Sequence, residues 1–171
     1  MAEVSISVRG VKELNQLLQE AINRAKNLRP AFISMAIDFY KSNREILLLK
    51  GPGQYQDLEE ATKRQKRRLG YKVYPILKRT GRLLNSVTKK TSPDTVFRMT
   101  GTTLTLGSNV PYGEYHQSPK TRSVIPYRPF VINSGVRGGR SRLWESRKFR
   151  WMRILTRYII KAIRRERGGP L

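Results

Sequence analysis

The first half of the chain carries two stretches in which apolar residues recur at helical spacing. Before them, residues 4–8 alternate apolar and polar side chains, which predicts a short half-buried strand that ends at Gly10. Apolar steps over residues 11–25 predict an amphipathic helix. A second helix is predicted from Pro30 to about Leu49, where a Gly-Pro-Gly sequence follows. Its buried side is expected to hold Phe32, Ala36, Phe39 and Ile46 or Leu47.

The middle of the chain changes to short, mixed elements. Residues 54–79 have few apolar anchors beyond a helical start, and we interpret them as a basic, partly mobile arm. Thr80 is expected to cap a short helix that buries leucines and Val87, with Gly81 allowing a close backbone approach. A hairpin is predicted over residues 95–106, and one helical turn after Pro111. Counting the N-terminal strand and an extended segment at 128–132, we expect a small antiparallel sheet of three or four strands.

A Gly- and Ser-rich joint at 134–141 precedes the last element. Residues 142–165 then predict a long amphipathic helix, because apolar and basic residues separate to different sides. Its apolar side is Trp144, Trp151, Leu155, Tyr158, Ile159 and Ala162, and its basic side is Arg147, Arg150, Arg153, Arg157, Lys161 and Arg164. The expected organisation is one α+β domain over residues 1–133, the joint, and a basic helix with its tail over 142–171.

Charge sharpens this outline. The 171 residues include 35 Lys and Arg against 12 Asp and Glu, a formal net charge of +23. Residues 63–90 contain eleven basic residues and no acid, and residues 137–167 contain twelve basic residues against two acids. Almost all of the net charge therefore lies in two blocks, which we interpret as contact surfaces for an anionic partner around a nearly neutral scaffold.

The chain is poor in reactive groups. It has no cysteine and a single histidine, His116, whose only near acid is Glu114; a metal site needs three or four ligands. Neither a phosphate-binding loop nor a nucleophile elbow is present. We expect a protein that is not an enzyme and uses no cofactor or metal. The start of the chain and its short aliphatic runs also argue against secretion and membrane spanning.

Two kinds of anionic partner remain open for the basic blocks. Phosphates of a nucleic acid would be neutralised without sequence readout, and aromatic residues in the blocks could stack on bases. The same charge would suit an acidic protein equally well, and the sequence carries no helix-turn-helix, zinc finger, ribonucleoprotein-type sheet motif or KH loop that would read a nucleic acid. The candidate contacts for either partner are Lys63, Arg64, Lys66, Arg67, Arg68, Arg147, Arg150, Arg153, Arg157, Lys161 and Arg164.

Short signatures in a fixed order bear on this choice. They begin with GVKEL at residues 10–14 and GQYQDL at 53–58, and continue with TGRLLNSV at 80–87, GSNVPYGEYHQ at 107–117 and RPFV at 128–131. In this order the chain resembles tail-completion proteins of tailed bacteriophages, also called virion morphogenesis proteins, over about residues 4–133. The positions that carry the later signatures are Thr80, Gly81, Leu83, Ser86, Tyr112, His116, Gln117, Arg128, Pro129 and Phe130. The chain departs from the family at Tyr55, where a tryptophan is usual. It also has Ser118-Pro119 after the His-Gln pair, where the family commonly has a glycine.

The resemblance implies an α+β fold without an active site, assembled as a ring of six copies in the virion neck, where the tail joins the DNA-filled head. Such a protein would be made in the host cytoplasm and would contact neighbouring neck and tail proteins. The hairpin and last helix would be the inter-subunit elements, and region 63–90 would reach a neighbouring ring. Most of the charge would then meet acidic proteins and a minority genomic DNA, because a channel that DNA traverses should not grip phosphates tightly.

Overall fold

The structure is a computed structural model that describes residues 11–48, 55–117, 126–131 and 142–165, with side chains described for 147–161 of the last range. The expected strand at 4–8, the Gly-Pro-Gly stop and the joint at 134–141 lie outside these residues. The described elements are α1 (Val11–Lys26), α2 (Arg29–Leu48), α3 (Glu60–Arg68), α4 (Arg82–Thr88), β1 (Thr95–Met99), β2 (Leu104–Ser108), α5 (Gly113–Gln117) and α6 (Arg142–Arg165).

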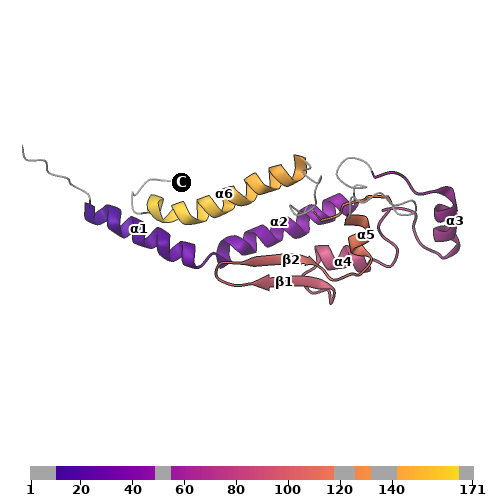
Figure 1. Cartoon of the computed structure of the whole chain (residues 1–171), viewed down its shortest axis with the longest axis horizontal. Coiled ribbons are helices and arrows are strands. Elements are labelled where there is room, and N and C mark those ends of the chain that lie inside the picture. The colour runs from indigo at the N-terminus through magenta and orange to yellow at the C-terminus, as the bar shows by residue number, and fades with distance from the viewer. Residues whose placement is uncertain (1–10, 49–54, 118–125, 132–141, 166–171) are drawn as a thin grey trace, which may run out of the picture.

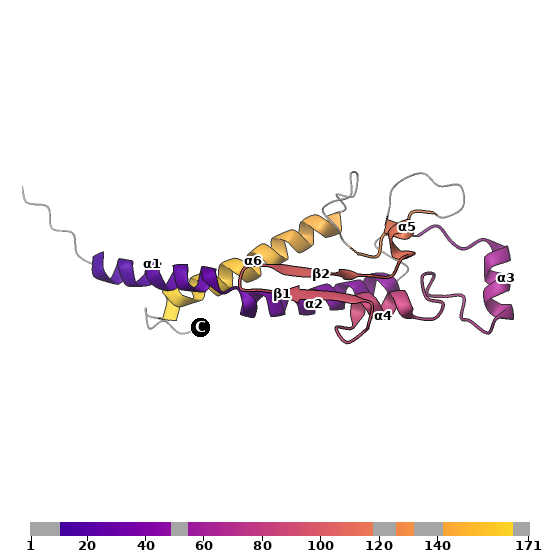
Figure 2. The same cartoon turned by 60° about the horizontal axis from the view of Figure 1, so that its bottom comes forward.

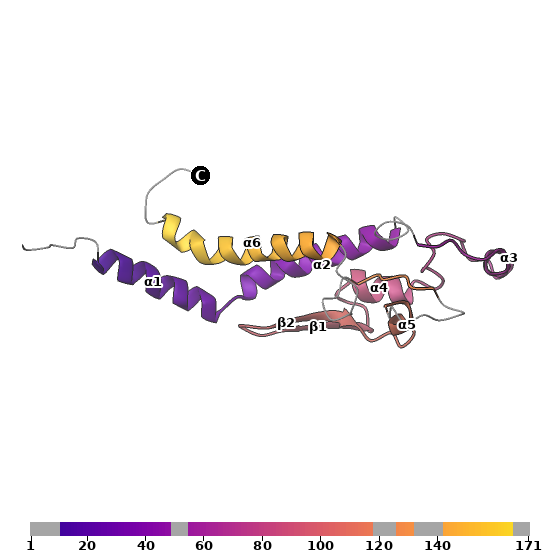
Figure 3. The ribbon, with the colours of Figure 1, turned by 45° about the horizontal axis from the view of Figure 1, so that its top comes forward.

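Helix α2 is the centre of an elongated molecule (Figure 1). Helix α6 lies along one side of it, and the β1–β2 hairpin with α4 lies along the other (Figures 1 and 3). The hairpin is antiparallel, with Phe97 opposite Leu106. Helix α1 extends beyond the hairpin at one end, and α3 projects at the other (Figure 2). The predicted α+β class, with a small antiparallel sheet packed with helices, is confirmed.

The core forms where α2 meets α4 and the segments that follow it. Leu47 on α2 joins Leu83 and Val87 on α4, together with Val110 and Phe130, in one buried cluster. Burying side chains of this size contributes about 1.5–3 kcal/mol each. The residues expected on the buried side of α2 are all buried, which confirms that prediction: Phe32, Ala36, Phe39, Ile46 and Leu47.

The hairpin turn is fastened to the junction of α1 and α2. Leu28 donates its backbone N–H to the carbonyl of Gly101 over 2.7 Å. A Cβ at Gly101 would come within 3.0 Å of the Lys26 carbonyl oxygen, so the glycine allows the backbones to approach. On the other side, the Tyr158 hydroxyl of α6 donates to the Asn27 carbonyl over 3.0 Å. The junction therefore holds three parts of the chain together.

Some expectations need correction. The described part contains two strands, because residues 128–131 pair with no strand there. The predicted partly mobile arm contains a regular helix, α3, which continues through the basic residues to Arg68. The cap of α4 is Gly81 and not Thr80, and Gly81 has φ of 88°. The nearest atom to a Cβ at Gly81 is 3.7 Å away, so this glycine supplies a left-handed backbone and not a close approach.

Helix α1 also differs from the expected packed scaffold, because none of its residues is buried. Its helical bounds agree with the prediction, whereas its apolar residues are divided between two faces. Leu17 and Ala21 lie half-buried on the side of Arg24, whose guanidinium lies 5.7 Å from the Tyr158 ring of α6. The other face is exposed and carries Val11, Leu14, Leu18 and Ile22.

Candidate partner-binding surfaces

Several signature residues lie around α4, where they pack against and hydrogen-bond with one another. Gly113 opens α5 against the core, where a Cβ would lie 3.2 Å from the Phe130 ring and 3.4 Å from Leu83. Gln117 closes the same site through its side-chain amide. Its Oε1 accepts the backbone N–H groups of Phe130 and Val131 over 3.1 and 3.2 Å, and its Nε2 donates to the Val131 carbonyl. One glutamine therefore does for this segment what a neighbouring strand would do.

Ser86 links the first signature to the hairpin. Its hydroxyl lies 2.7 Å from the Ser108 hydroxyl on β2 and donates to the Leu83 carbonyl over 2.8 Å. Its own carbonyl accepts the Thr95 hydroxyl of β1 over 2.8 Å. Ser86 is fully buried, so these contacts satisfy polar groups that would otherwise be costly inside the protein. Its role in the structure is architectural.

His116 and Arg128 are neighbouring polar residues of the signature region, and both have a buried side-chain nitrogen. The backbone N–H of Arg128 donates to the His116 carbonyl over 3.0 Å, and its Nη2 donates to the carbonyls of Gln56 and Asp57 over 2.9 and 3.3 Å. Arg128 is only 6% exposed, yet its Nε has no hydrogen-bond partner among the described residues. His116 Nδ1 is likewise buried without one. Burial lowers the pKa of both side chains, and the Arg128 charge lowers the pKa of His116 further.

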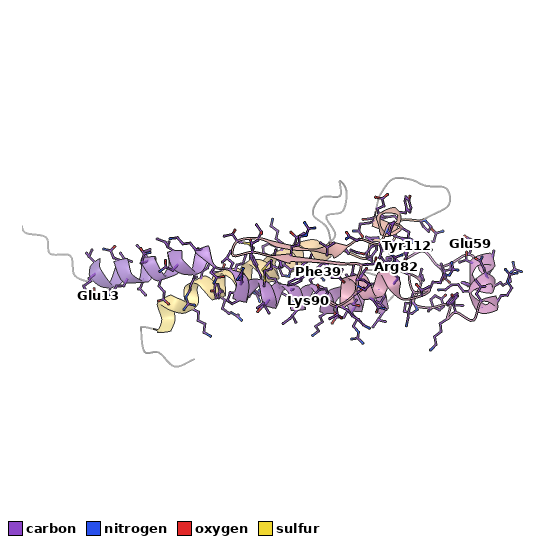
Figure 4. The ribbon with its side chains drawn as sticks, turned by 90° about the horizontal axis from the view of Figure 1, so that it is seen from below. Glu13, Phe39, Glu59, Arg82, Lys90 and Tyr112 are labelled. Carbon is purple, nitrogen blue, oxygen red and sulfur yellow. The ribbon has the colours of Figure 1, made fainter. Side chains whose placement is uncertain are left out.

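The pair lines a cavity of about 590 Å³ between α3, the following loop and α4. Figure 4 marks Arg82 and Tyr112, two of its lining residues, in the part of the molecule towards Glu59 and α3. Arg82 holds Asp94 through two bonds of 2.7 Å. A second cavity, of about 720 Å³, lies between α2 and β2 and is lined by Phe32, Leu104 and other apolar residues.

The basic residues predicted on α3 do not share one surface. Lys66 is 7% exposed and donates its Nζ to the Val73 carbonyl over 2.7 Å, so it fastens the loop after α3. Lys63 lies 3.0 Å from Asp57 and 2.7 Å from Glu60, and the bonds to these carboxylates raise the pKa of Lys63. This corrects the prediction for Lys66, which is not available as a surface contact. The remaining three, Arg64, Arg67 and Arg68, are exposed.

The basic side of α6 is also divided. Asp38 on α2 accepts the Arg150 guanidinium over 2.6 Å and the Trp151 indole N–H over 2.8 Å, and lies 3.8 Å from Arg147. Arg147 is 6% exposed, which corrects its prediction as a surface contact for a partner. Burial lowers the pKa of Arg147, and the side chain helps to hold α6 on α2. Arg150 is 62% exposed in its side chain. Arg153, Arg157 and Lys161 are exposed, and the Arg164 side chain lies outside the described residues.

The sequence pattern does not predict these contacts of Asp38 with α6. The only available signal was a lone acid close to Met35 and Phe39 on an otherwise apolar part of α2. Its partners come from α6, more than a hundred residues later in the chain. Periodicity identified α6 as amphipathic but could not separate Arg147 from the exposed arginines.

Exposed apolar side chains form two further surfaces. Within the described residues, fifteen large apolar or aromatic side chains are exposed and twelve apolar side chains are buried. At 100° per residue, the exposed positions of α1 fall on one face, away from the face that meets α6. Phe149, Met152 and Ile160 form a similar face on α6, with Phe149 68% exposed. Contiguous apolar faces of this kind are typical of protein interfaces.

Within the described ranges, no cluster of three or more acidic or histidine side chains could hold a metal ion. The helices described there also lack the length and apolar character needed to cross a membrane. Comparison with known proteins found no matching protein family, curated protein or solved structure.

Proposed function

We propose that this chain is a structural virion protein of a tailed bacteriophage, a neck or tail-completion ring component that joins the tail to the DNA-filled head. The observation that carries the proposal is the ordered set of signatures at residues 80–131, whose side chains pack and hydrogen-bond with one another. An architectural role explains why so many of these signature side chains make contacts within the fold. The proposed role is not enzymatic and uses no cofactor.

A ring gives the exposed apolar faces a partner. In a closed ring each copy buries the same heterologous interface, so a small chain gains stability from closure. Covering the four half-exposed aliphatic side chains of α1 would contribute about 3–6 kcal/mol per interface at roughly half the value of full burial. The hairpin adds a second candidate, because a two-stranded sheet has open edges and is marginal alone. We expect six copies, following the family that the chain resembles.

The exposed basic residues would meet acidic surfaces of neighbouring neck and tail proteins, with a minority contacting genomic DNA. Arg64, Arg67 and Arg68 on α3 lie at one end of the elongated subunit (Figure 1). Arg153, Arg157 and Lys161 follow the outer side of α6. Two basic surfaces at separate places on one subunit suit contacts with more than one neighbour.

A monomeric, sequence-independent nucleic-acid-binding protein is the second candidate function. The observation that favours it is the exposed Phe149 beside the basic residues of α6, since an aromatic ring can stack on a base. Neutralising about six phosphates would make log affinity fall with log salt at a slope near five. Absence of DNA binding, or binding that does not change with salt, would exclude this function.

Loss of the gene product tests the neck proposal. A phage that lacks this protein should accumulate filled heads and separate tails, because the joining ring is missing. Adding the purified protein to an extract that contains these heads and tails should restore joined particles. Normal joined particles in its absence would contradict the proposal.

A further inference from the structure

The edge of β2 that faces away from β1 is open. Just beyond the paired strands, the Asn109 N–H donates to the Asp94 carbonyl over 2.8 Å, so these two residues form a hydrogen-bonded pair. Hydrogen-bonded and non-bonded pairs alternate along an antiparallel ladder, so Leu104, Leu106 and Ser108 direct their backbone N–H and C=O groups away from β1. No described residue hydrogen-bonds to these outward groups, and no described strand besides β1 pairs with β2.

An apolar groove follows the same edge. It is the cavity of about 720 Å³, a size within the roughly 300–1,000 Å³ of known binding pockets. Leu104 and Leu106 line it from β2, Phe32 and Met35 line it from α2, and Trp151 lines it from α6. No residue of β1 is among its described lining residues, so the groove lies on the outer side of β2. A strand added to β2 would direct every second side chain into this groove.

The charge of the groove limits what can occupy it. Its described lining residues include no Lys or Arg, and the only acid among them is the exposed Glu114 of α5. A nucleic acid is bound chiefly through basic side chains, and an acidic protein needs a complementary positive surface. Neither finds a cation in this groove. An apolar strand with a neutral or positive charge fits it better.

The start of the chain has this character. Val4, Ile6 and Val8 alternate with two serines, and Arg9 follows them. Residues 4–8 are five in number, as are the residues of β2. Placed parallel to β2, this segment would bring Arg9 to the end of β2 that leads to α5 and Glu114. The apolar pattern, the length and the charge therefore all match the groove and its edge.

The segment cannot reach β2 of its own subunit. The hairpin turn lies at the C-terminal end of α1, where the Gly101 carbonyl accepts the Leu28 N–H over 2.7 Å. Helix α1 has 16 residues, so it is about 24 Å long, and it extends away from the hairpin (Figure 2). The three steps from Val8 to Val11 span at most about 11 Å. A strand formed by residues 4–8 must therefore come to β2 from another copy.

We propose that residues 4–8 of a second copy add as a parallel strand to the open edge of β2, with their apolar side chains in the groove and Arg9 beside Glu114. Backbone hydrogen bonds would provide affinity, and the groove would select the alternating side chains. The segment and the edge lie at different places on the subunit, so the contact is heterologous and its repetition can close a ring. The inference rests on the assembly in the proposed function and names one of its interfaces.

Cysteine cross-linking tests this contact, because the chain has no cysteine of its own. Full-length Ser5→Cys with a size tag would be mixed with full-length Thr105→Cys and oxidised. In the parallel register Ser5 lies beside Thr105 on the outward face, one strand spacing of about 5 Å away. Arg98→Cys is the matched control, because Arg98 is exposed and directly opposite Thr105 on β1.

The control position lies one strand further from the added segment. Its separation from Ser5 would be about 10 Å, beyond the Cβ–Cβ distance of about 3.5–4.5 Å that a disulfide requires. We expect Ser5→Cys to link to Thr105→Cys at least about tenfold faster than to Arg98→Cys. Ser7→Cys, tested in the same way, reports an antiparallel strand, in which Ser7 would lie beside Thr105.

Peptide competition supplies a second test. An N-acetylated, amidated peptide of residues 3–10, added in excess, should suppress the link between Ser5→Cys and Thr105→Cys. Ile6→Asp in this peptide places a charge in the apolar groove and should weaken competition at least about tenfold. Ser7→Asp makes the peptide equally acidic on the outward face and should change competition by no more than about threefold.

Every other result overturns the proposal. Equal linking to Thr105→Cys and Arg98→Cys would show random collision, and no link would remove the contact. Thr105→Cys that links to itself faster than to Ser5→Cys would replace the segment by the β2 edge of another copy. Faster linking through Ser7→Cys would reverse the strand and remove the contact of Arg9 with Glu114.

The peptide results decide the role of the groove. Equal competition by the Ile6→Asp and Ser7→Asp peptides would show that the groove does not hold the apolar side chains. All of these measurements use the purified chain, whereas the neck proposal is tested in virions and in phage extracts. Failure of the strand contact is therefore distinguishable from failure of the proposed function.

Discussion

Removing the Asp38 carboxylate should loosen α6 from α2. In Asp38→Ala, Trp151 and Arg150 lose an acceptor, and the 6% exposed Arg147 guanidinium loses its acidic neighbour. Breaking a buried ion pair by removing one partner costs about 3–5 kcal/mol. The Arg150 contribution is small, because that side chain is 62% exposed and such pairs contribute about 0–1 kcal/mol. We therefore expect a loss of about 3–5 kcal/mol, a large part of the roughly 5–15 kcal/mol of a whole domain.

Asp94→Ala is the matched control. The Asp94 side chain is 16% exposed and that of Asp38 is 12% exposed, so the two carboxylates are covered to a similar extent. The Arg82 partner of Asp94 is 53% exposed, so solvent screens this pair and removal of Asp94 should cost much less than removal of Asp38. Urea denaturation followed by tryptophan fluorescence and circular dichroism measures both variants, with Trp151 reporting on the α2–α6 contact.

Equal destabilisation of the two variants would refute the reasoning, because burial of the arginine would then not matter. A second variant separates loss of the pair from loss of packing. Asp38→Leu combined with Arg147→Leu removes both charges and should recover much of the stability, since apolar replacement of a buried pair is often neutral. A double variant as unstable as Asp38→Ala would also count against the account.

Three further predictions concern other parts of the chain. In the folded protein the pKa of His116 lies below its usual 6.5, so below about pH 6.5 unfolding takes up a proton at this side chain. The free energy of unfolding should therefore fall as the pH drops below about 6.5. Urea titrations at several pH values should show this slope, and His116→Gln should abolish it. Gly113→Val should cost about 1–3 kcal/mol by overpacking against Phe130, with Gly113→Ala costing less, as measured by thermal unfolding; equal costs would contradict the packing argument. Leu14→Glu with Leu18→Glu should prevent ring formation in native mass spectrometry, whereas Gln16→Glu, on the opposite side of α1, should not.

Local patterns were sufficient for the helices that have a strong periodicity. The bounds of α6 match the prediction, and α2 differs by one residue at each end, because its buried side and its flanking signals agree. The hairpin followed from two Thr-rich apolar runs around Thr100-Gly101-Thr102. In each case the information lies within a few residues of the element.

Contacts between distant segments could not be read in the same way. The extended character of residues 128–131 suggested a strand, whereas Gln117 satisfies that backbone from α5. Arg147 and Lys66 looked equivalent to their basic neighbours, and only the fold places one beside Asp38 and the other on the Val73 carbonyl. The apolar face of α1 was visible in the sequence, but its exposure was not, because exposure depends on which helix lies beside it.

An image of the assembled virion tests the neck proposal most directly. Electron cryomicroscopy of the particle should show a ring between head and tail into which the elongated subunit, with α2 between α6 and the hairpin, can be fitted in about six copies (Figure 3). Antibody labelling of the same particles should mark this position. A neck fully accounted for by other chains, or label found elsewhere or absent from particles, would contradict the proposal.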